Sequence, residues 1–369
     1  MRCKLGDVVD TVAGFAFKSK DFGSSFPDKV IKITHITPPT VDTCNLATVN
    51  LVPYKKDKLK RYIARQGDFV LAMTGATIGK IGRIETKTEA YINQRVLLFK
   101  PKSCVDRDFI YYALNSYFFA QYVINHVDSE SAQPNISAGT IEKYEFDLPE
   151  YEQQKKIGKL LRSLDAKIEL NNRINENLEQ QAQAIYFNMF TTNADPTWSL
   201  GHLSDLIVVK YGKDHKKLAD GAVPVFGSGG VMRYVERPLY EKESVLIPRK
   251  GTLNNVMYVN EPFWSVDTMF YSEMRRENLA KFVFHFVKSK DLLSLNAGSA
   301  VPSMTTDILN AMELQIPDAD SLERFEKNVS PMYRAIDQNK KTSKQLSLIR
   351  DTLLPKLMSG ELDVSEVEM

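Results

Sequence analysis

The sequence predicts an α+β protein in which two mixed α/β globular domains are separated by an antiparallel coiled coil of two long helices. Three observations support this prediction. The chain follows one plan twice, and each copy is a globular segment followed by a helical segment. Apolar residues change from strand-like alternation to a period of 3.5 residues after each globular segment. The two helical segments have similar lengths, so each can cover the apolar stripe of the other. We therefore expect a pseudo-two-fold internal repeat.

Similar runs mark the two copies. The first globular segment closes on PNISAGTIEKYEFDLP at Pro134–Pro149, and the second closes on PSMTTDILNAMELQIP at Pro302–Pro317. At the front, Lys4–Gly14 pairs with Ser199–Val209, and further on Gly67–Ile84 pairs with Glu243–Val259. The offset falls from 195 to 168 residues, so the first domain is about 27 residues longer. We expect these insertions in surface loops. The predicted boundaries are 1–149 and 191–318 for the domains, 150–190 for a central helix, and 319–369 for a distal helix with a C-terminal tail.

Steps of four and three residues separate the apolar positions of both helical segments, which is the seam of a coiled coil. Each seam turns polar near its middle, at Asn171 and Asn175 in one helix and at Asn339 and Ser343 in the other. Antiparallel pairing would bring these polar positions together, either to set the register or by chance. The first seam is Leu161, Leu164, Ile168, Asn171, Asn175, Leu178, Ala182, Ile185 and Met189, and the second is Val329, Met332, Ile336, Asn339, Ser343, Leu346, Arg350, Leu353 and Leu357.

Prolines and a glycine delimit the second helix. An internal proline costs about 3 kcal/mol, so we expect the helix proper to begin near Ser330, with Ser330 as its cap and Pro331 at the first position. Pro355 predicts a local kink, and Gly360 predicts the end of the helix.

The globular segments contain both strand and helix patterns. β-Branched and aromatic alternation predicts strands, and longer apolar segments predict helices. The expected strands are Val30–Ile36, Asp68–Met73, Lys80–Glu85, Tyr91–Phe99, Ser244–Pro248 and Val256–Val259, and the expected helices are Asp106–Asn115, Tyr117–Val127 and Asn278–Ser289.

Composition narrows the class of protein. The chain has 369 residues, of which 43% are hydrophobic and 25% charged, as expected of a folded globular protein of two or three domains. It contains no run of about 18 apolar residues, and its three cysteines form no C-x-x-C pair, so we expect a cytoplasmic protein with reduced thiols. The net charge is +2, with +4 in residues 1–149 and about zero elsewhere.

The motifs of common enzymes are missing. Gly75–Lys80 (GATIGK) is one residue too short for a phosphate-binding loop and lacks the following Ser or Thr. The sequence has no G-x-G-x-x-G and no H-E-x-x-H, and its five histidines are scattered. We therefore expect no catalytic, cofactor-binding or metal-binding residues in this chain.

Small, hydroxyl- or amide-rich loops with glycines and bases recur in both copies, and such residues read base edges or hold phosphates. They are 74–80 and 129–137 in the first copy, and 226–231, 249–255 and 296–305 in the second. A basic run with interleaved tyrosines, Lys55–Arg65, could contact phosphates or be a solvated face. The candidate DNA-binding residues are Thr74, Thr77, Lys80, Lys55, Lys56, Lys60, Arg61, Gln133, Asn135, Ser137, Ser228, Arg249, Lys250, Thr252, Asn254, Ser299, Ser303 and Thr305.

The duplicated plan, the run Leu148–Ile157 (LPEYEQQKKI) and the tail Thr352–Leu362 (TLLPKLMSGEL) resemble the specificity subunit of type I restriction-modification systems. The resemblance covers essentially the whole chain. It implies two target recognition domains that each read one half of a bipartite, asymmetric DNA site, with the paired helices setting the gap. It also implies docking of two modification subunits, which methylate adenines, and of restriction subunits in the full complex. S-adenosylmethionine, ATP and Mg would be bound by those partners only, and this chain would be noncatalytic.

Two alternatives stay open at this point. One is a coiled-coil scaffold whose two domains bind proteins. The other concerns Arg249, which could read a base, hold a phosphate or have a structural role.

Overall fold

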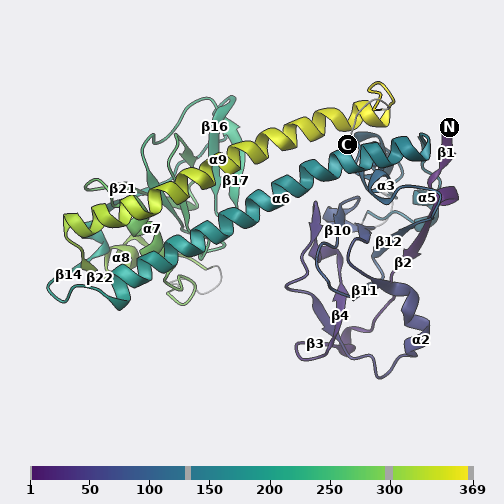
Figure 1. Ribbon diagram of the computed structural model, residues 1–369. Helices are drawn as coiled ribbons and strands as arrows, with labels where there is room; N and C mark the ends of the chain where they lie inside the picture. The colour runs from purple at the N-terminus through teal and green to yellow at the C-terminus, as the bar shows by residue number, and fades with distance from the viewer. Residues whose placement is uncertain (1, 129–133, 296–301, 365–369) are drawn as a thin grey trace. The chain divides into compact units, whose positions relative to one another are not determined.

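The computed structural model describes residues 2–128, 134–295 and 302–364. The chain divides into two compact units, which are described separately below. Unit 1 is Met1–Leu170 with Thr342–Met369, and unit 2 is Asn171–Lys341. Both long helices, α6 (Tyr151–Phe187) and α9 (Ala319–Met358), contribute to both units (Figure 1).

Unit 1 contains a six-stranded and a five-stranded sheet, a two-stranded ladder and short helices. Its helices are α1 (Leu5–Val8), α2 (Lys56–Leu59), α3 (Arg107–Leu114), α4 (Tyr117–Asn125) and α5 (Ala138–Glu142). Its strands are β1 (Arg2–Lys4), β2 (Val9–Ala13), β3 (Phe22–Gly23), β4 (Asp28–Ile31), β5 (Ile36–Thr37), β6 (Thr40–Val41), β7 (Ala47–Val49), β8 (Ile63–Ala64), β9 (Phe69–Ala72), β10 (Ile81–Arg83), β11 (Ala90–Ile92), β12 (Val96–Pro101) and β13 (Glu145–Asp147).

Unit 2 contains a four-stranded and a three-stranded sheet and a two-stranded ladder. Its helices are α7 (Ala280–Lys288) and α8 (Thr306–Asn310). Its strands are β14 (Ser199–His202), β15 (Ile207–Tyr211), β16 (Asp220–Gly227), β17 (Gly230–Val235), β18 (Ser244–Pro248), β19 (Met257–Val259), β20 (Trp264–Ser265), β21 (Met269–Met274) and β22 (Glu313–Ile316).

The same topology occurs in both units, which confirms the predicted repeat. The strand order β2-β12-β9-β10 in unit 1 matches β15-β21-β18-β19 in unit 2. In the second sheets, β4 pairs in parallel with β11 and antiparallel with β7, as β16 does with β20 and β17. The ladders β1-β13 and β14-β22 also correspond.

Two glycines mark one equivalent point in both units. A side chain at Gly14 would place its Cβ 2.1 Å from the carbonyl oxygen of Asn93, and one at Gly212 would place it 2.0 Å from that of Val266. The backbone segments therefore approach closely only because these residues lack a Cβ.

The longer connections of unit 1 account for its extra residues. The segment from Lys32 to Leu46 joins β4 to β7, whereas a two-residue turn, Ser228 and Gly229, joins β16 to β17. The predicted strand Val30–Ile36 is therefore wrong beyond Ile31, because the chain leaves the β11 ladder there and forms β5 and β6 beside β10. The predicted strand Tyr91–Phe99 divides into β11 and β12 because a turn intervenes.

The remaining strand and helix predictions in the globular segments are confirmed to within one or two residues. Apolar residues of these elements form the cores of the units, with the largest cluster of each unit including residues of both α6 and α9.

Within unit 2 the two long helices run antiparallel. Asn339 donates from Nδ2 to Oδ1 of Asn175 at 2.9 Å. Further along α6, Gln183 is joined through His285 to Tyr333, which lies earlier on α9. The contact between the polar middles of the seams is therefore confirmed, and all seam positions are buried or half-buried.

The expected start of the second helix near Ser330 is wrong. The helix α9 begins at Ala319, where the Asp318 carboxylate accepts from the backbone N–H of Ser321 at 2.6 Å and caps it. Pro331 lies on the exposed side within the helix. Burial of Leu322, Phe325 and Val329 outweighs the one backbone hydrogen bond that the proline removes.

The end of the helix agrees with the sequence. The helix α9 ends at Met358, and Gly360 adopts a φ of 73°, which favours glycine. The kink at Pro355 stays a prediction.

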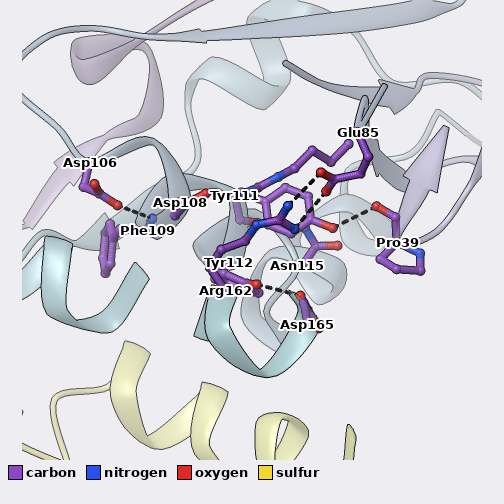
Figure 2. Close-up of polar contacts among 11 residues, drawn as sticks. Pro39, Glu85, Asp106, Asp108, Phe109, Tyr111, Tyr112, Asn115, Arg162 and Asp165 are labelled. Carbon is purple, nitrogen blue, oxygen red and sulfur yellow. Dashed lines mark hydrogen bonds and ion pairs between the residues drawn. The ribbon is translucent and has the colours of Figure 1, made fainter. Parts of the chain in front are cut away.

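A network of polar side chains joins the globular part of unit 1 to its segments of α6 and α9, and Figure 2 shows its contacts with α6. The Tyr112 hydroxyl donates to Asp165 at 2.6 Å, and Arg350 donates to the same carboxylate at 2.7 Å. Arg162 holds Glu85 through two hydrogen bonds of 2.8 and 2.7 Å. Burial, reinforced by the Asp165 charge, raises the pKa of Tyr112.

A neutral network occupies the corresponding place in unit 2. The imidazole of His285 lies between the Gln183 side chain at 2.6 Å and the Tyr333 hydroxyl at 2.8 Å. Burial lowers the pKa of His285 to about 4, so the ring is neutral at pH 7. In a neutral ring one nitrogen donates and the other accepts, which satisfies both contacts.

Candidate nucleic-acid interface

Two predicted loops come together in unit 1. Thr74 donates from its hydroxyl to the carbonyl of Pro134 at 2.9 Å, and the Gly75 N–H donates to the same oxygen at 3.1 Å. The Ile136 N–H donates to the carbonyl of Met73 at 3.0 Å. We call residues 73–80 and 134–136 the loop cluster of unit 1. Gly75 has a φ of 75°, and a Cβ there would meet no heavy atom within 4 Å.

Three predicted loops come together in unit 2. The Met304 N–H donates to the carbonyl of Arg249 at 2.9 Å, and Lys250 forms a β-bridge with Ser303. Asn255 donates from Nδ2 to the carbonyl of Ser228 at 2.7 Å. We call residues 226–231, 249–255 and 302–304 the loop cluster of unit 2.

The two clusters occupy equivalent places in the repeated fold. Met73 follows β9 and accepts from Ile136, just as Arg249 follows β18 and accepts from Met304. A glycine with positive φ follows two residues later in each case, at Gly75 and Gly251. The backbone frame is therefore shared, whereas the side chains that it presents differ.

The predicted DNA-binding side chains of the loops differ in their exposure to solvent. Lys80, Lys250, Thr252 and Asn254 are exposed, although Asn254 also bonds Asp291 and the Leu293 N–H. Half-buried positions are Thr77, Asn135, Ser228, Arg249 and Ser303, and Thr74 is buried. Gln133 and Ser299 lie outside the described residues.

Two predicted hydroxyls cap helices. Ser137 accepts from the Thr140 N–H at 3.0 Å at the start of α5, and Thr305 accepts from the Ile308 N–H at 3.3 Å at the start of α8. These hydroxyls already have a structural partner.

The guanidinium of Arg249 has a defined orientation. Its Nη1 donates to the carbonyl of Asp267 at 3.2 Å, and its Cζ lies 5.4 Å from the centre of the Tyr211 ring. Tyr211 is 51% exposed. The pair therefore presents a cation and an aromatic ring to solvent beside the loop cluster of unit 2.

The basic run lies elsewhere in unit 1, on α2 and the turn that follows it. Lys55, Lys56, Lys60 and Arg61 are exposed there, and Lys60 pairs with Asp57 at 2.7 Å. Within the described ranges, Lys60 and Arg61 contact Asp57 and Tyr62, which belong to the same segment. The interleaved tyrosines Tyr54 and Tyr62 pack into an apolar cluster with Phe15 and Phe17, so their spacing reflects the core.

Three residues next to the clusters, Gln94, Arg95 and Tyr211, were not predicted from the sequence. Gln94 and Arg95 are exposed in the turn between β11 and β12, and the Arg95 carbonyl accepts from the Met73 N–H at 2.9 Å. Tyr211 in unit 2 was also missed. A polar turn inside a strand-like run was the available signal for Arg95, whereas Tyr211 belongs to an ordinary strand pattern.

Three findings concern phosphate, metal and membrane binding in the described part of the chain. Gly75–Thr77 is a single 3-10 turn between β9 and β10, with no helix after it to bind phosphate. Residues 2–128, 134–295 and 302–364 hold no group of three His, Cys, Asp or Glu side chains suited to a metal ion. Within these ranges no helix has the length and apolar character to cross a membrane.

The fold and the loop clusters define a protein with two similar domains, each presenting a polar and basic loop surface, and two long helices shared between them. Residues 1–180 and 197–348 each match the family described as type I restriction modification DNA specificity domain. The chain therefore belongs to this family. It is a type I restriction-modification specificity subunit, a noncatalytic class of DNA-recognition protein.

Known relatives agree with this assignment. The type I restriction enzyme MjaIX specificity subunit of Methanocaldococcus jannaschii is 23% identical over 342 residues, covering 81% of this chain and 78% of that protein. The MjaVIII specificity subunit of the same organism is 30% identical over 191 residues, or 49% of this chain and 43% of that protein.

A solved structure shares the fold. The crystal structure of the type I restriction-modification S subunit from M. genitalium has a TM-score of 0.58 at 17% identity, covering 99% of this chain and 96% of that one.

Proposed function

We propose that this chain recognises a bipartite, asymmetric DNA site, with each loop cluster reading one half. The observation that carries the proposal is the recurrence of one backbone frame with different side chains. A shared frame suits the same task performed twice, and exposed side chains as different as Ala76 and Thr252, each next to the positive-φ glycine of its cluster, suit different base sequences.

The proposal includes two modification subunits, docked on a chain with two equivalent halves, and restriction subunits that join in the full complex. A nearly neutral net charge of +2 supports a need for partners, because nonspecific affinity for DNA comes mostly from phosphate neutralisation. A complex acting on cellular DNA would work in the cytoplasm. Native mass spectrometry of the copurified complex tests the stoichiometry, and a single bound modification subunit would contradict it.

Methylome sequencing of cells that express the complex tests site recognition directly. We expect one bipartite motif with unlike halves. Exchanging residues 73–80 and 134–136 for those of a relative with another specificity should change one half only. Unchanged methylation after both loop clusters are exchanged, together with salt-independent binding to DNA, would favour a protein-binding scaffold instead.

We also propose that the paired helices set the gap between the halves. Inserting seven residues in each helix adds about 10 Å, which is about 3 bp of DNA. The gap should lengthen while both half-sites keep their bases. New bases with an unchanged gap would contradict this role.

Within the second loop cluster, we propose that Arg249 reads a guanine. The Asp267 carbonyl and the Tyr211 ring fix the plane of its guanidinium, and a bidentate contact with guanine needs such a fixed plane. Replacement Arg249→Lys keeps the charge but loses the fork. It should cost about 1–3 kcal/mol at one base position. An equal loss of affinity for all DNA sequences would indicate a phosphate contact. Unchanged affinity and unchanged base preference would indicate a structural role.

A further inference from the structure

The ribbon of β16 and β17 carries exposed apolar side chains at its turn. Gly227 pairs with Gly230 across the turn, and next to this pair Val231 is 49% exposed and Met232 is 61% exposed. We call residues 227–232 the hairpin tip. The buried residues Val225 and Phe226 anchor the ribbon to the core of unit 2. The fold therefore leaves most of the apolar surface of Met232 exposed.

Residues 227–231 of the hairpin tip belong to the loop cluster of unit 2, and Met232 follows them directly. The Ser228 carbonyl accepts from Asn255, and a Cβ at Gly251 would lie 2.9 Å from the Ser228 hydroxyl. A Cβ at Gly229 or Gly230 would meet no heavy atom within 4 Å. DNA that contacts the loop 249–255 can therefore also reach the tip.

The shape of the tip indicates which part of DNA it fits. The major groove admits a two-stranded β-ribbon, and the thymine methyl is an apolar group on its floor. Methionine adapts its flexible thioether to such a group. We propose that the hairpin tip enters the major groove and that Met232 reads a thymine methyl in the half-site of the second domain. This inference rests on the proposed function and adds a specificity-determining residue to it.

In unit 1 the connection from β4 to β7 is built differently, because residues 32–46 form β5 and β6, which join the sheet at β10. The methyl contact should therefore occur in one half-site only. The other half-site serves as an internal control.

The test uses the complex with its modification subunits and a duplex that carries its methylated motif. Each thymine of the motif is replaced in turn by uracil, which removes only the methyl group. At one position of the second half-site the wild-type complex should lose about fourfold in affinity, the value for one buried methyl. Met232→Ala should bind the thymine and uracil duplexes equally at that position.

Two further variants sharpen the test. A Cβ at residue 227 would come within 2.6 Å of the Met232 sulfur, so Gly227→Ala should displace the thioether and also remove the uracil effect. The control is Leu200→Ala, which changes another exposed apolar residue of unit 2, 70% exposed on β14. This variant should keep the uracil effect.

The outcomes separate this inference from the proposed function. A wild-type complex that does not prefer its motif contradicts the proposed function. A preference for the motif without any uracil effect, or with one that persists in Met232→Ala, overturns the methyl contact alone. Loss of modification subunit from Met232→Ala would assign the tip to a protein contact and also overturn it.

Discussion

The two junctions between globular part and helices, one in each unit, use equivalent positions. Tyr112 lies 16 residues after Val96, the first residue of β12, and His285 lies 16 residues after Met269, the first residue of β21. Each contacts the residue that lies 16 positions after the closing proline of its own copy. That residue is Asp165 in unit 1 and Tyr333 in unit 2.

The chemistry of the two junctions differs. In unit 1 the network contains an ion pair, completed by Arg350 from α9. In unit 2 it is neutral, completed by Gln183 from α6. The comparison shows that the repeated topology determines where a polar contact lies, whereas any side chains that satisfy each other's hydrogen bonds can make it.

The largest expected effect comes from breaking the ionic junction. Asp165→Ala leaves the half-buried guanidinium of Arg350 and the hydroxyl of Tyr112 without their shared partner. We expect unit 1 to lose about 3 kcal/mol of stability, measured as the free energy of opening from hydrogen exchange of the α3 amides. The control is Asp351→Ala, which removes an exposed partner of Arg350 and should cost less than about 1 kcal/mol. Equal losses would show that the network adds nothing.

The neutral junction should make the stability of unit 2 depend on pH. The pKa of His285 is about 4 in the folded chain, against 6.5 ordinarily, so the unfolded chain binds more protons between these values. Stability therefore falls as the pH falls through this window. We expect a loss of about 2 kcal/mol between pH 7 and pH 5.

Tryptophan fluorescence can follow this transition, because the chain's two tryptophans, Trp198 and Trp264, both belong to unit 2. Denaturant unfolding at both pH values gives the free energy. The difference should shrink in His285→Gln, which has no imidazole to protonate. An undiminished difference in this variant would assign the pH dependence to other groups.

The smallest effects are expected from two helix-capping hydroxyls, which lie at equivalent positions of the two units. Ser137→Ala and Thr305→Ala should each cost about 1 kcal/mol through loss of a helix cap, and should leave the methylated motif unchanged. Ser137→Asp should restore the cap. An altered motif in either alanine variant would instead place that hydroxyl in the DNA interface.

The sequence alone determined the repeat, both coiled-coil seams and the loops that recur in the two copies. These features follow from patterns a few residues long, such as the steps of four and three from Leu161 to Met189. The loops were predicted as separate candidates. The sequence did not predict that they meet within each unit, at Met73 in unit 1 and at Arg249 in unit 2. The prediction that the second helix begins near Ser330 was wrong, because the local cost of Pro331 is smaller than the free energy gained by burying Phe325 and Val329.

The tertiary structure decided which side chains contact one another. Tyr112 and Arg350 meet at Asp165 although 53 and 185 residues of chain separate them from it. Tyr54 and Tyr62 joined a core instead of a binding surface, and Met232 remained exposed beside Gly227. The physical reason is that periodicity and capping depend on neighbours in sequence, whereas burial and polar pairing depend on segments that only the folded chain brings together.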